Sequence, residues 1–274
     1  MRWTERQQSM LRAMGVALWQ APAGSDASLG AGVGAGVGDG VGDSTAVADI
    51  AVPAAPFALP AEVRPPPQTM VVQAESMIAS MGWAELRDAV RGCTACGLCQ
   101  SRQQTVFGVG HERAHWMIVG EAPGEQEDRQ GEPFVGAAGR LLDRMLLALG
   151  LTRQDGGDAA QRAYIANTLK CRPPGNRNPT PQELAQCLPF LERQLMLVQP
   201  RLILAMGRFA VQALLGSQEP IGRLRGRVHT WQGRPVVVTY HPAYLLRQPS
   251  EKARAWADLC LACDTLDAAG CATP

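Results

Sequence analysis

The chain has 274 residues and a formal net charge of +1, so it can bury a sizeable core but has no overall basic character that would indicate nucleic-acid binding. It contains no apolar run of the roughly 18–20 residues that span a bilayer, and its N-terminus mixes charged with apolar residues, unlike a secretory signal. Eight cysteines are too sparse for a disulfide scaffold, so we expect a reducing, cytoplasmic setting in which clustered cysteines bind metal or do redox chemistry.

The first 74 residues are expected to lie outside the folded domain. Residues 1–20 carry apolar side chains at helical spacing and predict an amphipathic helix, either a frayed extension or a helix that docks on a protein partner. Residues 21–74 are rich in Gly, Ala and Pro and cannot bury enough apolar surface to offset chain entropy, which predicts a disordered linker. The compact domain is expected over 75–265, with a tail at 266–274.

Four short apolar runs within this domain predict strands. They are apolar on both faces rather than alternating, as expected for a parallel sheet covered on both sides. The runs are HWMIVG (115–120), AYIANT (163–168), RLILAM (201–206) and PVVVTY (235–240).

Helical patterns separate these runs, at 139–150, 180–198 and 208–216. The second opens with a capping box, in which Thr180 is the N-cap and Glu183 the N3 residue, and it contains Pro189, which predicts a kink or a restart. Strands that alternate with helices predict an α/β fold. We expect a three-layer αβα domain with a central, mostly parallel four-stranded sheet, preceded by the disordered N-terminal extension.

Polar residues follow three of the predicted strands. GEAPGEQED (120–128) follows the first strand, Asn167 ends the second, and HPAYLLR (241–247) follows the fourth. Each has an ordinary structural interpretation when taken singly, as a turn, a turn cap or a helix start. Ligands of open parallel sheets bind at the carboxyl ends of the strands, so the convergence of Glu121, Asn167 and His241 predicts a site at this edge.

Four cysteines are expected beside the same edge. Cys93 and Cys96 form a C-x-x-C pair, Cys171 lies four residues after Asn167, and Cys187 falls inside the capped helix. Four thiolates suit zinc or a [4Fe–4S] cluster, and the wide separation of the second pair favours iron–sulfur. Spacing alone does not exclude Cys99 as a ligand. A second C-x-x-C, at 260–263, lies in an amphipathic terminal pattern and is interpreted as core packing.

A basic stretch flanks His241. Between positions 223 and 254 the sequence has seven basic side chains and one acidic side chain, Glu251. Such a run is by itself most simply a solvated face, but beside a predicted site it favours contacts with backbone phosphates of nucleic acid. The candidates here and in the loop after the second strand are Arg172, Arg177, Arg223, Arg225 and Arg247.

The motifs together resemble a known family. GEAPGEQED, GEPFVG, IANTLKCRPPGNRNPTPQE and HPAYLLR are similar to those of the family 4 uracil-DNA glycosylases, the iron–sulfur branch of the uracil-DNA glycosylase superfamily. The resemblance covers about 85–262; any one motif is weak, but the set is specific. It implies an enzyme of base excision repair that flips deoxyuridine out of DNA and hydrolyses its N-glycosidic bond, leaving an abasic site.

The resemblance also implies roles for individual residues. His241 is similar to the residue that donates to the uracil O2, Asn167 to the one that reads the N3 and O4 edge, and Phe134 to the aromatic that stacks on the base. Gly120, Glu121 and Ala122 resemble the turn that lines the uracil pocket. The family's [4Fe–4S] cluster is carried by cysteines that match Cys93, Cys96, Cys171 and Cys187, and not Cys99.

The chain departs from the best-known branch of the superfamily at two positions. Ala122 stands where that branch has an Asp that positions the attacking water, and Gly124 where it has a Tyr that blocks the thymine methyl; members of family 4 commonly lack both. Glu121 is the first candidate to handle the water and Glu127 a candidate steric guard against thymine; the alternative is that the rate rests mainly on electrostatic stabilisation of the leaving uracil, with the water captured by a cation that has already formed. Gly97 follows the second cysteine, where the family usually has Pro.

Two other functions stay open. Ala122 and Cys99 are compatible with a non-catalytic iron–sulfur protein that binds DNA or senses redox state and recruits repair partners. A zinc-stabilised hydrolase of another nucleoside bond is the third, and visible absorption would exclude it because zinc is d¹⁰. We expect a monomer that binds DNA containing deoxyuridine, with no membrane partner.

Overall fold

The computed structural model describes residues 77–270, so the helix predicted at 1–20 and the linker predicted at 21–74 lie outside the described residues. The described part contains one sheet with the strands β1 (Val109–Gly110), β2 (Trp116–Gly120), β3 (Ala163–Asn167), β4 (Leu202–Met206), β5 (Val228–Trp231) and β6 (Arg234–Thr239). The α-helices are α3 (Trp83–Arg91), α4 (Glu125–Gln130), α5 (Ala137–Ala148), α6 (Pro181–Val198), α7 (Arg208–Leu215), α8 (Ile221–Leu224), α9 (Pro242–Arg247) and α10 (Lys252–Gly270). Short 3₁₀ turns are η1 (Gly97–Gln100), η2 (Ala159–Gln161), η3 (Pro174–Asn176) and η4 (Pro249–Glu251).

The strands are ordered β1-β3-β2-β4-β6-β5 across the sheet. The four central strands are parallel, and β2 lies between β3 and β4 with Ile118 opposite Ile165 and Leu204. The two edge strands are antiparallel to their neighbours. The predicted α/β fold and its four parallel strands are confirmed, but the sheet has six strands rather than four, because β1 and β5 were not predicted.

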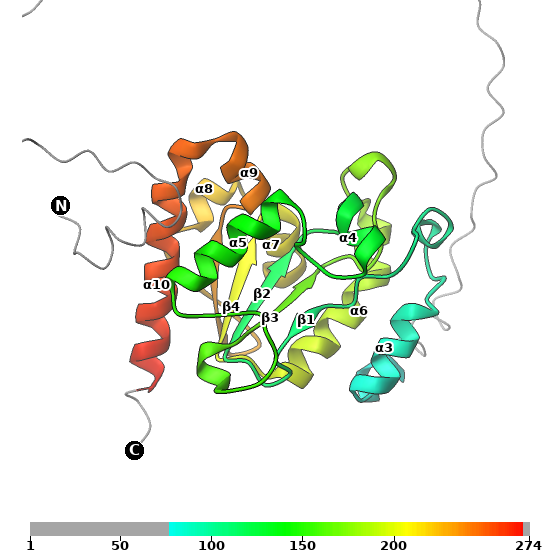
Figure 1. The fold of residues 1–274 in the computed structure, drawn as a ribbon, viewed down its shortest axis with the longest axis horizontal. Coiled ribbons are helices and arrows are strands. Elements are labelled where there is room, and N and C mark those ends of the chain that lie inside the picture. The colour runs from blue at the N-terminus through cyan, green and yellow to red at the C-terminus, as the bar shows by residue number, and fades with distance from the viewer. Residues whose placement is uncertain (1–76, 271–274) are drawn as a thin grey trace, which may run out of the picture.

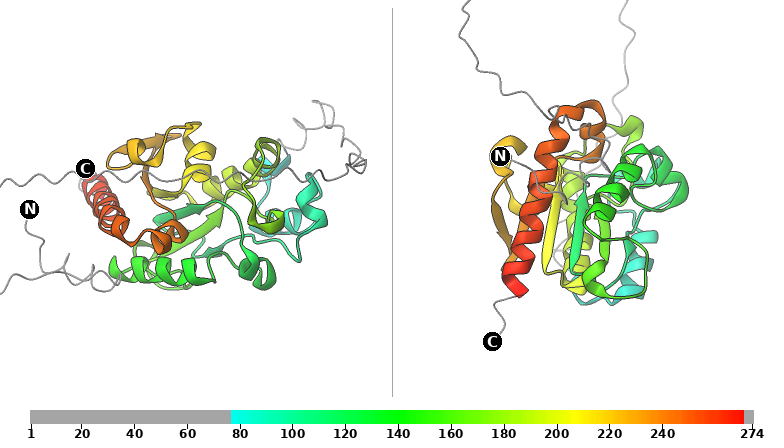
Figure 2. Two further views of the ribbon diagram at one scale, coloured as in Figure 1. Left: turned by 90° about the horizontal axis from the view of Figure 1, so that it is seen from above. Right: turned by 60° about the vertical axis from the view of Figure 1, so that its left-hand side comes forward.

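Helices cover both faces of the sheet, which gives three layers (Figures 1 and 2). Alternate strand residues, such as Ile118 and Leu204, pack against α5, α9 and α10, where Met145 and Trp256 are buried. The other strand residues, such as Val119 and Ala205, pack against α6, α7 and α8. Strands β2, β3 and β4 are buried along their whole length and β6 over its last four residues, which explains why their sequences are apolar without alternation.

Helix α6 begins as predicted. The Thr180 hydroxyl accepts from the backbone N–H of Glu183, and the Glu183 carboxylate accepts from the N–H of Thr180. The helix continues through Pro189 without a restart. Helix α10 extends to Gly270, beyond the expected domain end at 265. Among residues 77–270, no helix combines the length and the apolar character that crossing a bilayer needs.

Candidate active site and candidate metal centre

A cleft of about 850 Å³ opens at the carboxyl ends of the parallel strands. The arrowheads of β2 and β4 in Figure 1 point toward this end of the molecule, where α9 lies. The cleft is large enough for a nucleotide. Five of the six residues that were expected to contact a base line it, namely Glu121, Ala122, Phe134, Asn167 and His241; Gly120 lies directly behind them at the end of β2.

Asn167 presents an unsatisfied acceptor at the floor of this cleft. It ends β3, its side chain is 2% exposed, and its Oδ1 has no hydrogen-bond partner among the described residues. A buried acceptor without a partner costs about 1–3 kcal/mol, so most such atoms in proteins are paired. An unpaired amide oxygen in a cleft is therefore placed to bind a ligand N–H.

His241 is held in one tautomer by the start of α9. It is the N-cap, and its Nδ1 accepts a hydrogen bond of 3.2 Å from the backbone N–H of Ala243. Burial, with a smaller contribution from Arg247, lowers the pKa of His241 to about 4, although the ring keeps partial contact with the cleft. The imidazole is therefore neutral at pH 7, and its single proton is on Nε2, which can act as a donor.

Phe134 forms the apolar wall of the cleft. Its ring stacks on the His241 ring with centroids 5.3 Å apart and planes at 28°. Gly120 makes this approach possible, because a Cβ there would lie 2.4 Å from Asn167 Oδ1 and 2.6 Å from Phe134 Cζ. The residue at the end of β2 must therefore be glycine for Phe134 and Asn167 to keep these positions.

Two carboxylates line the cleft and differ in their environment. Glu121 is partly exposed, and desolvation raises the pKa of its carboxyl group, with Arg208 opposing that shift. Glu127 is held by the backbone, since its carboxylate accepts from the N–H groups of Gly124, Val135 and Gly136 at 3.0–3.2 Å. In the described part of the chain, the Glu121 carboxylate thus has no such backbone donors holding it and faces the cleft, while Glu127 joins two loops of the cleft wall.

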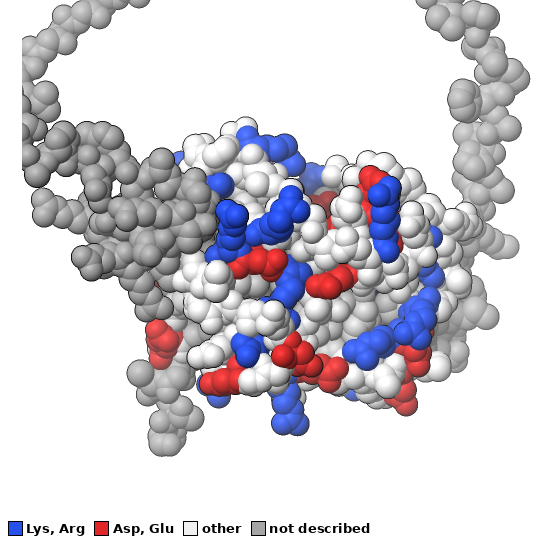
Figure 3. All heavy atoms as spheres, in the orientation of Figure 1, with Lys and Arg blue, Asp and Glu red and all other residues white. Residues whose placement is uncertain are grey.

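The five predicted phosphate-binding arginines occupy different places. Arg177 and Arg247 line the cleft, and Arg177 also forms a two-point ion pair with Glu183 at 2.6 and 2.9 Å. Arg172 is not in the cleft lining, but it donates to Asn176, which is, at 2.8 Å. Figure 3 shows several basic side chains over α5 and α9 on the face drawn there.

The other two arginines are also outside the cleft lining, although Arg223 follows the lining residue Gly222 and Arg225 lies over the ring of the lining residue Tyr240. Arg223 is exposed on α8. Arg225 forms an ion pair of 2.9 Å with the fully buried Asp258 of α10, which also accepts from Thr239 at 2.9 Å. This internal position differs from the exposed one that a phosphate contact was expected to need.

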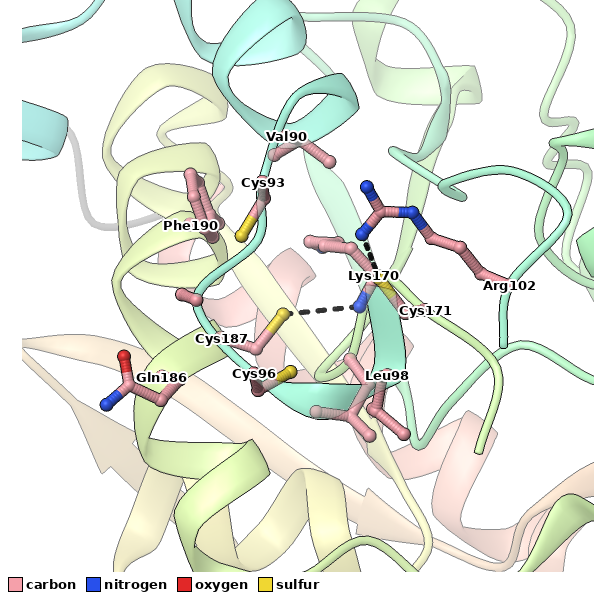
Figure 4. Close-up of a pocket in the computed structure, with 12 residues that line it drawn as sticks. Val90, Cys93, Cys96, Leu98, Arg102, Lys170, Cys171, Gln186, Cys187 and Phe190 are labelled. Carbon is pink, nitrogen blue, oxygen red and sulfur yellow. Dashed lines mark hydrogen bonds between the residues drawn. The ribbon is translucent and has the colours of Figure 1, made fainter. Parts of the chain in front are cut away.

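The four predicted metal ligands line one cavity. Cys93 and Cys96 precede and begin the η1 turn, Cys171 follows β3, and Cys187 lies in α6; Figure 4 shows their sulfur atoms around a common space. Cys99 is not among the residues that line it. The cavity is otherwise mainly apolar, so the four predicted cysteines share one lining, while Cys99 lies nearby but outside it.

Hydrogen bonds to two of the sulfur atoms suit metal-bound thiolates. Arg102 donates to Cys171 Sγ at 3.1 Å, and the backbone N–H of Lys170 donates to Cys187 Sγ at 3.3 Å. Burial raises the pKa of Cys187 to about 12, so this thiol is protonated unless a metal displaces its proton. Among residues 77–270, no three His, Cys, Asp or Glu side chains converge closely enough for a single ion.

Three residues near these sites were not predicted. Arg208 lines the cleft at the first turn of α7. Arg102 and Lys170 lie beside the cysteines, where the buried Lys170 Nζ donates to the Asn167 carbonyl at 2.8 Å and to Gln194 at 2.6 Å. Lys170 could have been placed from the sequence, because it precedes Cys171. Arg102 and Arg208 could not, because only the folded loops bring Arg102 to the cysteines and Arg208 to the cleft.

Comparison with known proteins finds similarity to the family that the sequence motifs resemble. A sequence model of the uracil DNA glycosylase superfamily matches residues 107–260. A type-4 uracil-DNA glycosylase of Archaeoglobus fulgidus is 44% identical over 175 residues, which cover 60% of this chain and 84% of that protein. One of Thermotoga maritima is 42% identical over 169 residues (61% and 84%), and a type-5 uracil-DNA glycosylase of Thermus thermophilus is 34% identical over 149 residues (50% and 68%).

Proposed function

The chain belongs to the uracil-DNA glycosylase superfamily, and we propose that it removes uracil from DNA by hydrolysis of the N-glycosidic bond, leaving an abasic site for repair. The observation that carries this proposal is the buried, unpaired Oδ1 of Asn167 in the same cleft as a neutral His241 and the Phe134 ring. A uracil that is flipped out of the helix can meet all three groups.

Asn167 would select uracil over cytosine. Its amide offers one acceptor, which pairs with the uracil N3–H, and donors, one of which pairs with O4. Cytosine has an acceptor at N3 and an amino group at C4, so the same amide would face two mismatched groups. The free Oδ1 supports this assignment, because an N3–H would satisfy it.

His241 would stabilise the departing uracil. Bond cleavage places negative charge on the base and positive charge on the sugar, so a donor aimed at O2 binds the transition state more tightly than the ground state. The Ala243 N–H occupies Nδ1 and leaves the proton on Nε2. A neutral imidazole with this tautomer donates without first having to change its protonation state.

Glu121 would orient the attacking water. It lines the cleft and its carboxyl is not tied to the backbone in the way that Glu127 is. The raised pKa of Glu121 brings a carboxylate closer to the range in which it can take a proton from water. Ala122 has no group for this task, which leaves Glu121 as the carboxylate at the turn after β2.

The arginines at the cleft would bind the DNA backbone. Arg177 and Arg247 lie in the lining and can meet phosphates on either side of a flipped nucleotide. Arg172 and Arg223 would extend this contact. Arg225 has the weakest support, because its guanidinium is ion-paired with Asp258.

Cys93, Cys96, Cys171 and Cys187 would hold a [4Fe–4S] cluster. The four thiols share one mainly apolar cavity, and two of them accept hydrogen bonds of the kind that cluster ligands take. A single tetrahedral zinc would need sulfur atoms about 3.8 Å apart, and among residues 77–270 no three His, Cys, Asp or Glu side chains converge closely enough for one ion. The ligands of a four-iron cluster can lie farther apart, because each binds a different iron. When bound, the cluster supplies a structural cross-link, since the hydrolysis transfers no electron.

Excision on a single-uracil oligonucleotide tests the proposal. The full-length protein, purified anaerobically, should remove uracil, so that alkali treatment then cleaves the U-containing strand at the abasic site. Matched T and C oligonucleotides should stay intact. Asn167→Ala and His241→Ala should lose most of this activity while remaining folded. A folded protein that binds the U-containing oligonucleotide but excises no base from any of the three would instead support the alternative hypothesis of a non-catalytic iron–sulfur protein.

A further inference from the structure

On the basis of the proposed function, we propose that Arg153 is a positioning residue that holds Phe134 in the orientation needed to stack on uracil. Arg153 follows α5 in the stretch LTRQDGGD and lies outside the motifs that identify the family. It does not line the cleft that contains Phe134, so it acts on that cleft through the backbone.

Phe134 has a backbone conformation that needs support. Its φ of +55° lies in the left-handed region, which residues other than glycine rarely adopt. Such strained positions persist only where the surrounding structure fixes them, and they cluster at functional sites. Helix α5 also approaches closely, because a Cβ at Gly139 would lie 1.7 Å from the Phe134 carbonyl oxygen.

Arg153 supplies the donors for this strained segment. Its Nη1 donates to the Pro133 carbonyl at 2.7 Å and its Nη2 donates to the Phe134 carbonyl at 3.1 Å. Its Nε donates to Asp143 at 2.7 Å, and its side chain is 13% exposed. The planar guanidinium thus spans two successive carbonyl groups, a task for which the point charge of lysine is poorly shaped.

Glu127 fixes the other half of the same segment. Its carboxylate accepts from the N–H groups of Val135 and Gly136 at 3.0 and 3.2 Å. The carbonyls of 133–134 therefore face a cation, and the N–H groups of 135–136 face an anion. The backbone at Phe134, and with it the direction in which the side chain leaves the chain toward His241, cannot change unless one of these charge-assisted contacts breaks.

Single-turnover excision with two variants and a matched control tests the proposal. Arg153→Met removes the donors and keeps an apolar stem, while Arg153→Lys is the milder change. We expect about a 10- to 100-fold slower excision for Arg153→Met, because small displacements of a reacting group have effects of this size, and a smaller loss for Arg153→Lys. Arg162→Met should leave the rate unchanged, because Arg162 donates to Gly156 and Gln161 within its own loop.

The same substitutions in a Phe134→Ala background decide whether Arg153 acts through the ring. If it does, Arg153→Met should change the rate there by less than about twofold. An equal loss in both backgrounds, or no loss in the native background, would overturn the proposal. Should Arg153→Met not fold, the comparison is made with Arg153→Lys.

A second readout does not depend on excision. The chain has four histidines, and a His241→Gln spectrum identifies the His241 ring signals in NMR of the free protein. These signals should shift in Arg153→Met, because the Phe134 ring is stacked on His241, and should not shift in Arg162→Met. If the native protein cuts no uracil, the proposed function fails, and unchanged His241 signals would separately refute the positioning role.

Discussion

Replacing Asn167 with leucine should separate base recognition from folding. The native Oδ1 is buried without a partner, which costs about 1–3 kcal/mol, and leucine removes that cost with nearly the same shape. We expect the free energy of unfolding to be unchanged or higher by up to about 2 kcal/mol. Excision should fall roughly 30-fold to 10⁴-fold, because the N3–H and O4 of uracil lose partners worth about 1–3 kcal/mol each.

Denaturant unfolding and single-turnover excision on a U-containing oligonucleotide measure the two effects. Thr168→Val is the matched control, since the buried Thr168 hydroxyl donates to the Gly120 carbonyl at 2.9 Å and its loss should lower stability by about 1 kcal/mol. If leucine does not fit, Asn167→Ala replaces it. Near-native excision by the variant at 167 would refute the recognition role, and a stability lower than that of Thr168→Val would refute the reasoning from the unpaired acceptor.

Three further predictions concern the same sites. The pKa of His241 is about 4 in the folded protein against 6.5 in the unfolded chain, so its contribution to stability is complete above pH 6.5 and is lost as the pH falls toward 4. The loss is at most about 3 kcal/mol; native protein should therefore lose more stability than His241→Gln between pH 7.5 and 4.5, and equal losses would contradict the shift. Cys171→Ala should lose visible absorption and bound iron, whereas Cys99→Ser should keep both; iron analysis and an absorption spectrum check this, and a colourless but stable and active Cys171→Ala would count against a structural cluster. Gly120→Ala places a Cβ 2.4 Å from Asn167 Oδ1, so it should abolish excision and lower the free energy of unfolding by about 1–3 kcal/mol; near-native turnover would show that the cleft adapts.

The central sheet could be predicted because burial on both faces leaves a simple sequence pattern. Three of the four parallel strands are fully buried and β6 is buried over its last four residues, so continuous apolar runs locate them. The edge strands lack this signal: β1 has two residues, and β5 is buried only at Trp231. The hairpin between β5 and β6 does have a weak signal in Gln232-Gly233, both with positive φ, which is the conformation of a tight hairpin turn.

The positions of site residues could be predicted where those residues lie at strand ends. They could not be predicted where they depend on how loops pack. Asn167 and His241 follow strands, and topology carries them to one edge. The place of Arg153 depends on a side chain that reaches back to carbonyls 19 and 20 residues away. Arg225 belongs to a basic run that predicts an exposed side chain, but its ion pair with the buried Asp258 holds it largely out of solvent. No local pattern indicates either partner.

The segment from Asn167 to Cys171 explains why a structural cofactor would matter for a reaction that needs no electron. One end of the segment supplies the base-reading amide and the other a proposed cluster ligand. Between them, the buried Lys170 ammonium donates to the Asn167 carbonyl, while its N–H donates to Cys187 Sγ. A buried charge is costly unless it is hydrogen-bonded, so moving Lys170 away from the Asn167 carbonyl and Gln194 would carry a large cost. Cluster loss would free Cys171 and Cys187, and the resulting movement would reach Asn167 within four residues of the backbone.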